Sequence, residues 1–377
     1  MLILVAWSLP SAAHDLRGHR GPTYEITEPI RIETGQNLLK LHVLEQGTGQ
    51  PTAARFSLAV DGEAHTLETL GEGGLRFVSI HAGRKLAYAA LYARGSGEVE
   101  VPLPPGARSG TVHLAKGLEY LPVEVPFAVV GKTAAVTAEL RRWSDIRSKG
   151  WLPAEEHLHY DRTDPAHDRD WLTILAGDDL AYGHFLVLKG GNLPSIWATQ
   201  YAYGKEGQAG DGQRLICPGE EYRDSMQGHI NLLGIEEVIP PIQAGTPEHP
   251  YHYPAFYDVL QRARDLGGLV GPAHGTALGR SPSGIADTIL VAVDFFEIAN
   301  THLYKTDVWY RLMNCGFIVP PAAGTDLPNF PFRDLWQPLL GEVRTYVHTG
   351  GKTDFDSFKQ AVKRGEVFVS GGPREWN

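Results

Sequence analysis

The pattern of apolar residues changes once along this chain, and that change limits the folds it can adopt. Up to about residue 140, short apolar runs with strand-like spacing are separated by Gly, Pro and Asp turns. Examples are NLLKLHVL (38–45), ARFSLAV (54–60) and EVEVPLP (98–104). Strands that recur every eight to twelve residues or so are typical of a β-sandwich. We therefore predict a β-sandwich accessory domain over residues 14–140.

From residue 141 onward, strand-like apolar runs alternate with helix-like segments. FLVLK (185–189), GGLVGPAHG (267–275) and TILVAVDFFEIAN (288–300) are interpreted as strands. YPAFYDVLQRARDLG (253–267) has helical spacing, with Gly267 as its C-terminal cap. Continuous apolar strands with intervening helices indicate a parallel sheet or barrel. The predicted fold class is α/β, with a barrel over residues 141–377 that follows the sandwich.

Charge and composition bear on the possible partners. The chain has 377 residues, a formal net charge of −10 and no basic run. This balance argues against nucleic acid and anionic membrane surfaces as partners. No stretch after the N-terminus has the roughly 20 apolar residues that a membrane span needs. Two distant cysteines, Cys217 and Cys315, do not favour a thiolate metal site. The oligomeric state is not given by the sequence.

The first residues, MLILVAWSLPSAAHD, resemble a secretory signal. The apolar run from Leu2 to Trp7 leads to the small residues Ser11, Ala12 and Ala13, as at a cleavage site. The usual positive residues at the start are missing, and a buried strand or a frayed tail is the alternative. We predict a signal peptide over residues 1–13 and a secreted or periplasmic protein.

Metal-binding residue types recur near the ends of the apolar runs in the second half. They are His157, His159, Glu220, Glu221, His229, His274, Glu297 and Asp326. His157 and His159 share one face if AEEHLHYDRTD (154–164) is a strand. In α/β sheets and barrels, the C-terminal strand ends form the active-site face. Imidazoles with carboxylates suit Zn, Mn or Fe, so the set predicts a metal centre. Each histidine alone could equally be an ordinary core or surface residue.

These motifs resemble the CehA/McbA branch of the PHP (polymerase and histidinol phosphatase) metallohydrolases. The matching stretches include EEHLHYDR, CPGEEYRDSMQGHINLLG, GPAHG, FFEIAN, CGFIVPPAAGTD and VRTYVHTGGKTDFDSFKQAVKRGEVFVSGGP. The resemblance covers about residues 140–373 and implies a distorted (β/α)7 barrel with a multinuclear metal site. It implies one metal ion near His157, His159, Glu221 and Asp326, and a second near Glu221, His229 and His274.

The chain departs from the family pattern at two histidines. The family's TDH after the second strand is replaced by Lys189-Gly190-Gly191-Asn192, and Pro328 stands where the last histidine of SDxH is expected. Because these histidines usually serve a third metal, we expect one or two divalent ions, Zn, Mn or Fe. GPAHG also has Gly275 in place of the family's proline.

Six further residues are predicted to take part in catalysis or substrate binding. The candidate catalytic residues are Asp161, Lys189 and Arg344, and the candidate substrate-binding residues are Asn300, His302 and His252. Asp161 could position a metal-bound water, and Lys189 could face an anionic substrate. A surface role for Lys189 and an internal ion pair for Arg344 are the alternatives.

The function predicted first is hydrolysis by metal-activated water. The resemblance implies a phosphoester, or a carboxylic or carbamic ester or amide, as the bond cleaved in a small-molecule or polymer-linked substrate. The alternative is a secreted carbohydrate- or surface-binding protein with a degenerate barrel, which the two missing histidines favour. A third possibility is a metal-assisted polysaccharide lyase with Lys189, Tyr160 or His302 as its base.

Overall fold

The computed structural model describes residues 24–33, 35–81, 84–189, 196–275, 284–291, 293–300, 303–328 and 340–372. The predicted signal peptide and His302 lie outside these residues. None of the described helices combines the length and the apolar character needed to span a bilayer.

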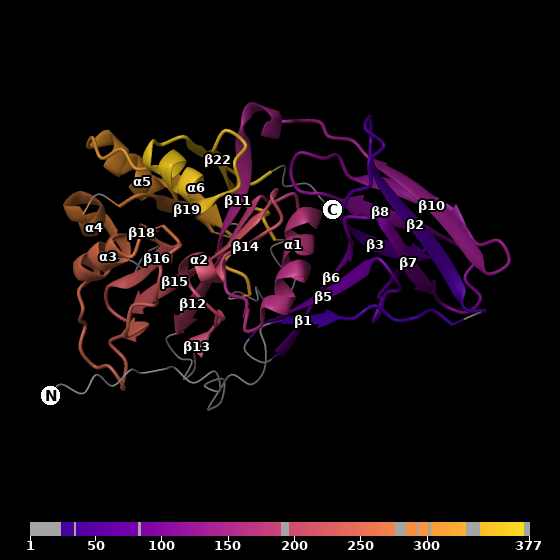
Figure 1. Ribbon diagram of the computed structural model, residues 1–377, viewed down its shortest axis with the longest axis horizontal. Coiled ribbons are helices and arrows are strands. Elements are labelled where there is room, and N and C mark those ends of the chain that lie inside the picture. Colours follow the sequence, from indigo (N-terminus) through magenta and orange to yellow (C-terminus); the bar gives the residue numbers. More distant parts are fainter. Residues whose placement is uncertain are drawn as a thin grey trace.

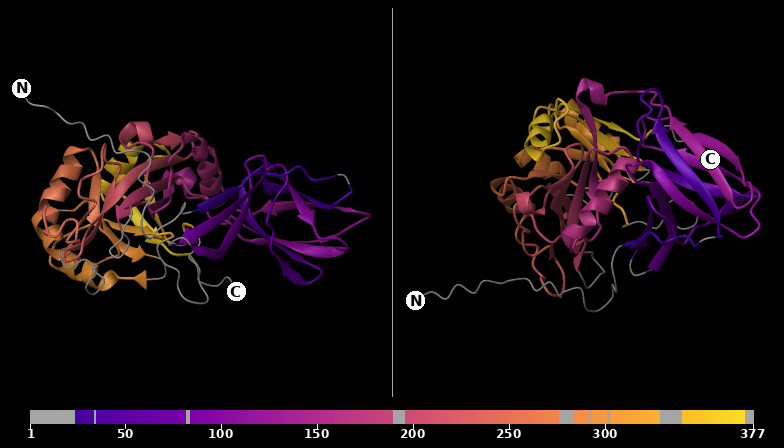
Figure 2. Two further views of the ribbon diagram at one scale, coloured as in Figure 1. Left: turned by 90° about the horizontal axis from the view of Figure 1, so that it is seen from below. Right: turned by 45° about the vertical axis from the view of Figure 1, so that its right-hand side comes forward.

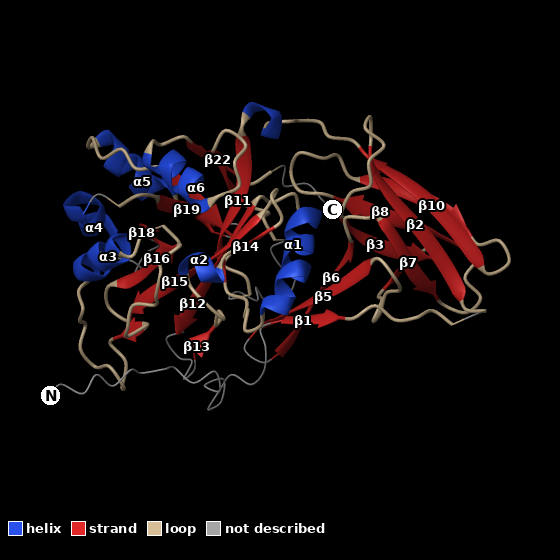
Figure 3. Ribbon diagram, in the orientation of Figure 1, coloured by secondary structure: helices blue, strands red, loops and turns tan. Residues whose placement is uncertain are grey.

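In the described chain up to Leu140, every regular element is a strand, and the strands form two sheets (Figures 1 and 3). The larger sheet has the order β1 (Tyr24–Thr27), β5 (Gly74–His81), β6 (Arg84–Ala93), β3 (Ala54–Val60), β8 (Ser109–Ala115) and β9 (Val123–Ala128), with β4 (Glu63–His65) paired to β3. The smaller sheet has the order β10 (Thr133–Leu140), β2 (Asn37–Glu45) and β7 (Glu98–Leu103).

One apolar core joins these two sheets. Strand β10 alternates exposed and buried residues along its whole length, and β3 does nearly the same. The inward residues Val136 of β10, Leu41 of β2 and Phe56 of β3 belong to one cluster. Period-two burial of this kind is what a sheet with one covered face requires. This part of the chain is strand-rich as predicted, and its assignment as a β-sandwich domain stays a prediction.

The second part of the chain is built on a ten-stranded sheet. Its main path is β18 (Leu269–Pro272), β16 (Gly228–Leu233), β15 (Leu215–Asp224), β12 (Tyr182–Lys189), β11 (Trp151–Leu158), β22 (Arg344–His348) and β23 (Val367–Ser370). Three short strands pair off this path: β13 (Ile196–Trp197), β14 (Ala209–Gly210) and β17 (Gln243–Ala244). The strands β11, β12 and β15 are parallel neighbours, whereas β16 and β22 run antiparallel to β15 and β11. The predicted parallel arrangement therefore holds for β11, β12, β15 and the short β17, and it is wrong for β16 and β22.

A separate three-stranded sheet lies beside the ten-stranded one. It has the order β20 (Leu303–Tyr304), β19 (Phe296–Asn300) and β21 (Pro321–Gly324). Strand β21 contacts β11, and β19 contacts β18. Contacts between neighbours thus lead from β11 through β12, β15, β16, β18, β19 and β21 back to β11. This arrangement brings the ends of strands that are distant in the sequence to one place.

Helices occur only in the second part of the described chain (Figure 3). They are α1 (Asp168–Gly177), α2 (Gly204–Gly207), α3 (Phe256–Asp265), α4 (Gly284–Val291), α5 (Thr306–Asn314) and α6 (Phe355–Lys363), with 3₁₀ turns at Arg147–Lys149 and Pro165–His167. The predicted helix at 253–267 is confirmed as α3. The interpretation of 288–300 as one strand is wrong, because its first residues belong to α4 and only Phe296–Asn300 form a strand.

The two parts of the chain are packed against each other, although Figure 2 shows them as distinct lobes. Phe77 of β5 lies edge-on to Tyr160 and Trp171 of the second part, with ring centroids 5.5 and 5.4 Å away. The Tyr92 hydroxyl donates to an Asp178 carboxylate oxygen at 2.7 Å. The Nζ atom of buried Lys116 donates to the carbonyl oxygen of Ala176 at 2.6 Å. Apolar contacts and hydrogen bonds thus both hold the strand-only part against α1 and the residues next to it.

Candidate metal centre

Six side chains from five different strand ends meet in one cluster, which we call the His/carboxylate cluster. Its members are His157, His159, Glu221, His229, His274 and Asp326. They come from β11 and the residue after it, from β15 and β16, and from just beyond β18 and β21. Five of the six are buried, and the His229 side chain is about one-fifth exposed (22%). The structure therefore brings together all six ligands that the sequence predicts.

One side of the cluster is formed by the HxH pair and two carboxylate oxygens. The His159 Nε2 atom lies 3.3 Å from Glu221 Oε2 and 3.1 Å from Asp326 Oδ1. The His157 Nε2 atom lies 3.8 and 3.6 Å from the same two oxygens. Donors about 2.0–2.1 Å from a tetrahedral metal ion lie roughly 3.4 Å from one another. The atoms of His157, His159 and Glu221 fit a single ion, and Asp326 Oδ1 lies beside the two imidazoles.

The other side uses the second oxygen of each carboxylate. Glu221 Oε1 lies 3.0 Å from His229 Nδ1 and 3.3 Å from His274 Nε2. Asp326 Oδ2 lies 3.3 Å from His274 Nε2. Glu221 therefore presents one oxygen to each imidazole pair, whereas Asp326 contacts His157 and His159 through Oδ1 and His274 through Oδ2. The resemblance implied Asp326 as a ligand of one metal only, and its second oxygen also faces His274 of the other imidazole pair.

Several donor atoms in the cluster are buried without a hydrogen bond. Among the described residues, the atoms His157 Nε2, His159 Nε2, His274 Nε2 and Glu221 Oε1 have no hydrogen-bond partner. Leaving a buried polar atom unsatisfied costs roughly 1–3 kcal/mol, so four in one place require an explanation. A bound cation satisfies them together, because each offers a lone pair toward the same small volume. The residues present thus fit one or two divalent metal ions.

The ring nitrogens on the far side of the HxH pair are held by acceptors. His157 Nδ1 lies 3.0 and 3.1 Å from the two oxygens of Glu297, and His159 Nδ1 lies 2.7 Å from the carbonyl oxygen of Leu186. Such bonds fix the ring so that Nε2 carries the lone pair for a metal. The Glu297 carboxylate also accepts from the His274 backbone N–H at 2.5 Å. Glu297 therefore orients the His157 ring and holds the backbone of His274.

Glu155 connects the strand β11 to the segment that carries Asp326. Its carboxylate accepts from the backbone N–H groups of His157, Thr325 and Gly341 at 3.1, 2.8 and 3.1 Å, and from the Thr325 hydroxyl at 2.8 Å. Burial raises the pKa of Glu155 to about 7, against the lowering effect of these donors. The sequence analysis gave no role to Glu155, and the structure shows that it connects the Thr325–Asp326 segment to the strand of His157.

Two of the ligands have an unusual backbone conformation. His274 and Asp326 have φ angles of 57° and 55°, in the left-handed region that non-glycine residues rarely adopt. Strain of this kind persists where surrounding structure requires it, commonly at functional sites. Gly275 also has a φ of 55°, an angle that the proline ring forbids. This explains why glycine replaces the proline of the related motif here.

The charges of the cluster stabilise one another. Burial alone would raise the pKa values of Glu221 and Asp326, but Arg223 and the imidazoles hold the pKa of Glu221 well below its usual range, and the imidazoles alone do the same for Asp326. Burial would lower the pKa of His274, yet the carboxylates of Asp326 and Glu221, each 3.3 Å from its Nε2 atom, raise it to about 9. Burial and Arg223 together lower the pKa of His229 to about 4. The two carboxylates are therefore ionised, as metal ligands must be.

The predicted catalytic residues lie in other places. Asp161 accepts from the Thr199 backbone N–H at 3.0 Å, and the Lys189 Nζ atom lies 3.3 Å from Glu248 at the rim. Arg344 is buried with its guanidinium bonded to the carbonyl oxygens of Gly341, Asp178 and Asp179. Each guanidinium nitrogen of Arg344 therefore donates to a backbone oxygen, and none of these acceptors is a member of the cluster.

The described residues that were predicted to bind substrate are Asn300 and His252. Asn300 donates to Glu297 at 3.1 Å, and it therefore contacts a residue that supports the cluster. His252 lies 2.9 Å from Asp224, at the end of β15, and is partly exposed. Tyr160, one of the bases considered for a lyase, lies 3.0 Å from the Ser79 hydroxyl and is fully buried between the two parts.

Two residues of the β15–β16 hairpin were missed in the sequence. The Arg223 guanidinium donates to Glu221 Oε2 through Nε and Nη2, at 2.9 and 2.5 Å. The Asn231 amide nitrogen lies 3.1 Å from His157 Nδ1. The available signal was spacing, since Arg223 is two residues after Glu221 and shares its face of the strand.

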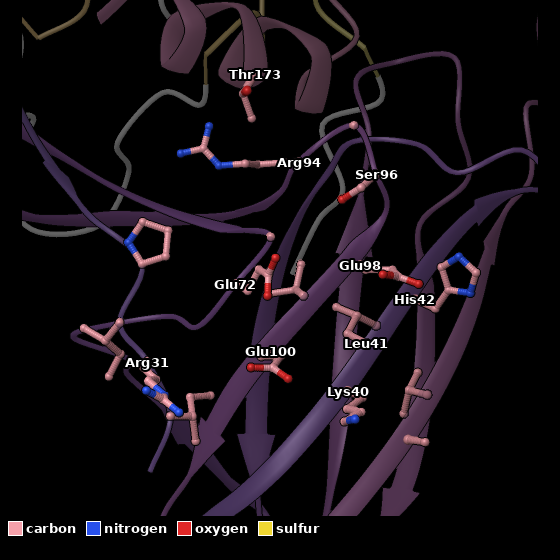
Figure 4. Close-up of a pocket in the computed structure, with 18 of the residues that line it drawn as sticks. Arg31, Lys40, Leu41, His42, Glu72, Arg94, Ser96, Glu98, Glu100 and Thr173 are labelled. Atoms are coloured by element: carbon pink, nitrogen blue, oxygen red, sulfur yellow. The ribbon is translucent and has the colours of Figure 1, made fainter. Parts of the chain in front are cut away.

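A hollow in the strand-only part is separate from the cluster (Figure 4). It lies over the sheet of β2, β7 and β10, with Lys40, His42, Glu98 and Glu100 on its floor and Thr173 of α1 at its edge. It contains one imidazole among charges of both signs, and Arg94 at its edge is paired with Asp170 at 2.7 Å. None of the predicted site residues lines it.

Comparison with known proteins gives matches among solved structures. No family model matches the chain, and no curated protein matches its sequence. A two-domain Bacteroides vulgatus protein containing a predicted PHP-like metal-dependent phosphoesterase is similar over 58% of this chain and 64% of its own, at 13% identity and a TM-score of 0.39. PsfC from Pseudomonas syringae is similar over 56% and 87%, at 14% identity and a TM-score of 0.36.

The lesion-specific endonuclease Q from Pyrococcus furiosus is similar over 58% of this chain and 57% of its own, at 16% identity and a TM-score of 0.36. The chain thus spans less than two thirds of this protein and of the Bacteroides protein. Another matching structure is endonuclease Q in complex with a DNA duplex. The prediction that nucleic acid is excluded as a partner is therefore wrong, because a net charge over the whole chain does not describe the charge at one site.

Proposed function

We propose that the chain is a metal-dependent hydrolase that cleaves an ester-type bond. The observation that carries this proposal is Glu221, which has one oxygen toward each imidazole pair, beside Asp326, which faces His159 and His274. A purely structural site closes around one ion, whereas hydrolytic sites share carboxylates between ions and leave positions open. The motif resemblance adds the PHP superfamily, its CehA/McbA branch and a distorted (β/α)7 barrel over residues 141–377.

The residues of the chain would divide the work as follows. His157 and His159 would hold one ion with Glu221 and Asp326, and His229 and His274 would hold the second with Glu221. When bound, the ions would supply a water of lowered pKa and a Lewis acid for the oxygen that gains charge. Glu297 would keep the His157 ring oriented, and burial of the cluster would strengthen each charge interaction.

The experiment that tests this proposal is elemental analysis of the purified protein beside a His157→Ala/His159→Ala double variant. We expect one to two equivalents of Zn, Mn or Fe in the natural chain and a clear reduction in the variant. The matched control is His113→Ala/His348→Ala, because both of those imidazoles are about 41% exposed and lie outside the cluster. Its metal content should equal that of the natural chain.

Hydrolysis is then measured on phosphate, carboxylate and carbamate esters, with and without a chelator. Loss of hydrolysis on chelation and its return with added metal are the expected results. A protein that takes up no metal, even when it is supplied, would overturn the proposal. That result would favour the binding-protein alternative, and glycan or surface ligands would become the subject of the search.

A further inference from the structure

The hollow over β2, β7 and β10 takes no part in the proposed function. Its volume is about 1320 Å³, which is above the roughly 300–1,000 Å³ of a pocket for one small molecule. Leu41, Val99 and Val136 line its floor, but their side chains belong to the core between the two sheets and are almost fully buried. In the described part of the chain, no Phe, Tyr or Trp side chain lines it. The surface that it offers to a ligand is therefore mainly polar.

The walls of the hollow are held by backbone hydrogen bonds and by one ion pair. The Glu100 backbone N–H donates to the carbonyl oxygen of Glu72 at 3.0 Å. The Arg94 backbone N–H donates to the carbonyl oxygen of Gly73 at 2.9 Å. The Arg94 guanidinium lies 2.7 Å from Asp170 of α1, so this wall is joined to the second part of the chain (Figure 4). The hollow is thus formed before a ligand enters, which reduces the entropy lost on binding.

Charged side chains of both signs line the hollow without pairing with one another. Apart from Arg94, which is paired with Asp170, three basic side chains and four glutamates line it. Within the described ranges, none of these seven side chains takes part in an ion pair or a hydrogen bond. The hollow therefore presents unused donors and acceptors whose charges nearly balance. Such a lining gives no strong attraction to a ligand of either net charge.

Donors and acceptors alternate on the floor of the hollow instead of gathering at separate ends. In the antiparallel pairing of β2 with β7, Lys40 lies opposite Glu100 and His42 lies opposite Glu98 (Figure 4). Side chains of directly opposed residues share a face, with Cβ atoms about 4.5–5.5 Å apart. A ligand group between Lys40 and Glu100 must accept from the ammonium and donate to the carboxylate. A hydroxyl does both, whereas a ligand carboxylate only accepts and a ligand ammonium only donates.

We propose that the hollow binds a neutral saccharide chain through its hydroxyl groups. A saccharide carries hydroxyls on adjacent carbon atoms, so neighbouring hydroxyls can meet the Lys40/Glu100 and His42/Glu98 pairs in succession. A linked chain of sugars also suits a volume that exceeds the needs of one small molecule. The site lies in the strand-only part and at the edge of α1, and it does not depend on metal binding at the His/carboxylate cluster.

The test is titration calorimetry of the full-length chain with neutral oligosaccharides as probes. Maltohexaose, cellohexaose, xylohexaose and N-acetylated chitohexaose cover different linkages and substituents, and an alternating Lys–Glu hexapeptide serves as a zwitterionic probe. We expect at least one oligosaccharide to bind and the peptide not to bind. A roughly tenfold rise in NaCl should change the oligosaccharide affinity by less than about twofold, because salt screens interactions between charges and the probe has none.

Two variants locate the binding in the hollow. Lys40→Met and Glu98→Gln should each weaken oligosaccharide binding about 10-fold or more, the loss expected when a charge-assisted hydrogen bond is removed. Both side chains are exposed, so the fold should tolerate the changes. The matched control is Glu139→Gln, because Glu139 is an exposed residue of β10 that does not line the hollow. It should bind as the natural chain does, and metal content should be the same in all three variants.

Three results would overturn the saccharide assignment. The first is that none of the four oligosaccharides binds. The second is that the hexapeptide binds in their place, which would make the hollow a site for a zwitterionic chain. The third is that an oligosaccharide binds equally well to Lys40→Met, Glu98→Gln and the natural chain, which would put the binding elsewhere. Because these measurements require no hydrolysis, the hydrolase proposal stands or fails independently of them.

Discussion

Gly324 lies so close to β11 that a methyl group there would overlap the strand carrying His157. A Cβ atom at this position would lie 2.3 Å from His157 Cβ and 2.8 Å from its backbone nitrogen. We expect Gly324→Ala to lower the free energy of unfolding by about 1–3 kcal/mol, as overpacking does, and to reduce metal content because His157 is displaced. Urea unfolding and elemental analysis measure the two effects.

The control for this substitution is Gly95→Ala, because no atom lies within 4 Å of a Cβ at that position and its φ angle is ordinary. It should leave both metal content and stability nearly unchanged. A Gly324→Ala protein with the stability and metal content of the natural chain would show that β21 can move away from β11 without cost.

A second residue-scale prediction concerns the buried His184. Burial between β12 and α6, against Phe355 and Phe358, lowers its pKa from 6.5 to about 4. The folded pKa is below the unfolded one, so the unfolded chain binds the extra proton and the fold loses stability as pH falls from 6.5 toward 4. This amounts to roughly 2 kcal/mol between pH 7.5 and 5.0.

His184→Leu should remove this part of the pH dependence. Urea unfolding at pH 7.5 and 5.0, with a chelator in both buffers, measures it without interference from metal binding. His113→Leu is the control, because that imidazole is 41% exposed. An equal loss of stability at pH 5.0 in His184→Leu and in the natural chain would contradict the prediction.

The sequence identified the six residues that meet in the His/carboxylate cluster, but it did not identify the residues that hold them in place. The cluster could be predicted because histidines and carboxylates stand at the ends of apolar runs, where a sheet brings them together. Glu155 could not be distinguished from Glu156, because strand alternation tells which residues share a face but not which face is the cluster. The role of Arg344 depended on carbonyl oxygens of Asp178 and Asp179, which have no residue-specific signal.

At the scale of elements, helix α3 shows how a local signal decides a boundary. The helix is capped at Leu266, and Gly267 then takes a φ of 78° while the Gly267 and Gly268 N–H groups donate to the carbonyl oxygens of Arg264 and Ala263. The nearest atom to a Cβ at Gly267 is 4.0 Å away, so a side chain would have room there. Only the positive φ angle makes a residue other than glycine unfavourable at this position. This is why the sequence located the helix end correctly.

Gly267→Ala should therefore lower the free energy of unfolding by about 1 kcal/mol, with no change in metal content. Gly267→Asn should cost less, because asparagine tolerates the left-handed region better than alanine does. Urea unfolding of the two variants makes the comparison. If alanine were tolerated as well as asparagine, the backbone angle would not be what ends the helix.

Elements without such a local signal were harder to predict. The run TILVAVDFFEIAN contains β-branched and aromatic residues throughout, yet α4 includes its first residues and β19 its last. Apolar content alone does not separate a buried helix from a buried strand. Strand direction was equally hidden, because β16 pairs antiparallel with β15 through a tight hairpin that apolar spacing does not reveal.

At the scale of the whole molecule, the two parts of the chain share one apolar cluster. It includes Leu75, Phe77 and Tyr92 of the strand-only part with Trp171, Ile174 and Leu175 of the second part. Such contacts join residues about 80–100 positions apart, which no periodicity in the sequence can reveal. The cluster indicates that the strand-only part stabilises the part that carries the metal-binding candidates, and the two should unfold together.

Phe77→Ala tests this coupling. Phe77 is 3% exposed, and its removal should lower the free energy of unfolding by about 3–5 kcal/mol. Residues 14–140 contain no tryptophan, so tryptophan fluorescence reports unfolding of the rest of the chain. The fluorescence midpoint in urea should therefore shift to lower concentration together with the midpoint from circular dichroism, although the substitution is in the strand-only part.

Phe127→Ala distinguishes unfolding of the whole chain as one unit from a local effect of the Phe77 substitution on its neighbour Trp171. Phe127 is buried in the core that joins the two sheets of the strand-only part, away from the shared cluster. If the chain unfolds as one unit, this variant also shifts the fluorescence midpoint. The reason is that the lost packing lowers the single free energy of unfolding that every probe reports. If the fluorescence midpoint stays in place while circular dichroism shows an earlier transition, the two parts unfold independently and the metal-binding part does not depend on its neighbour for stability.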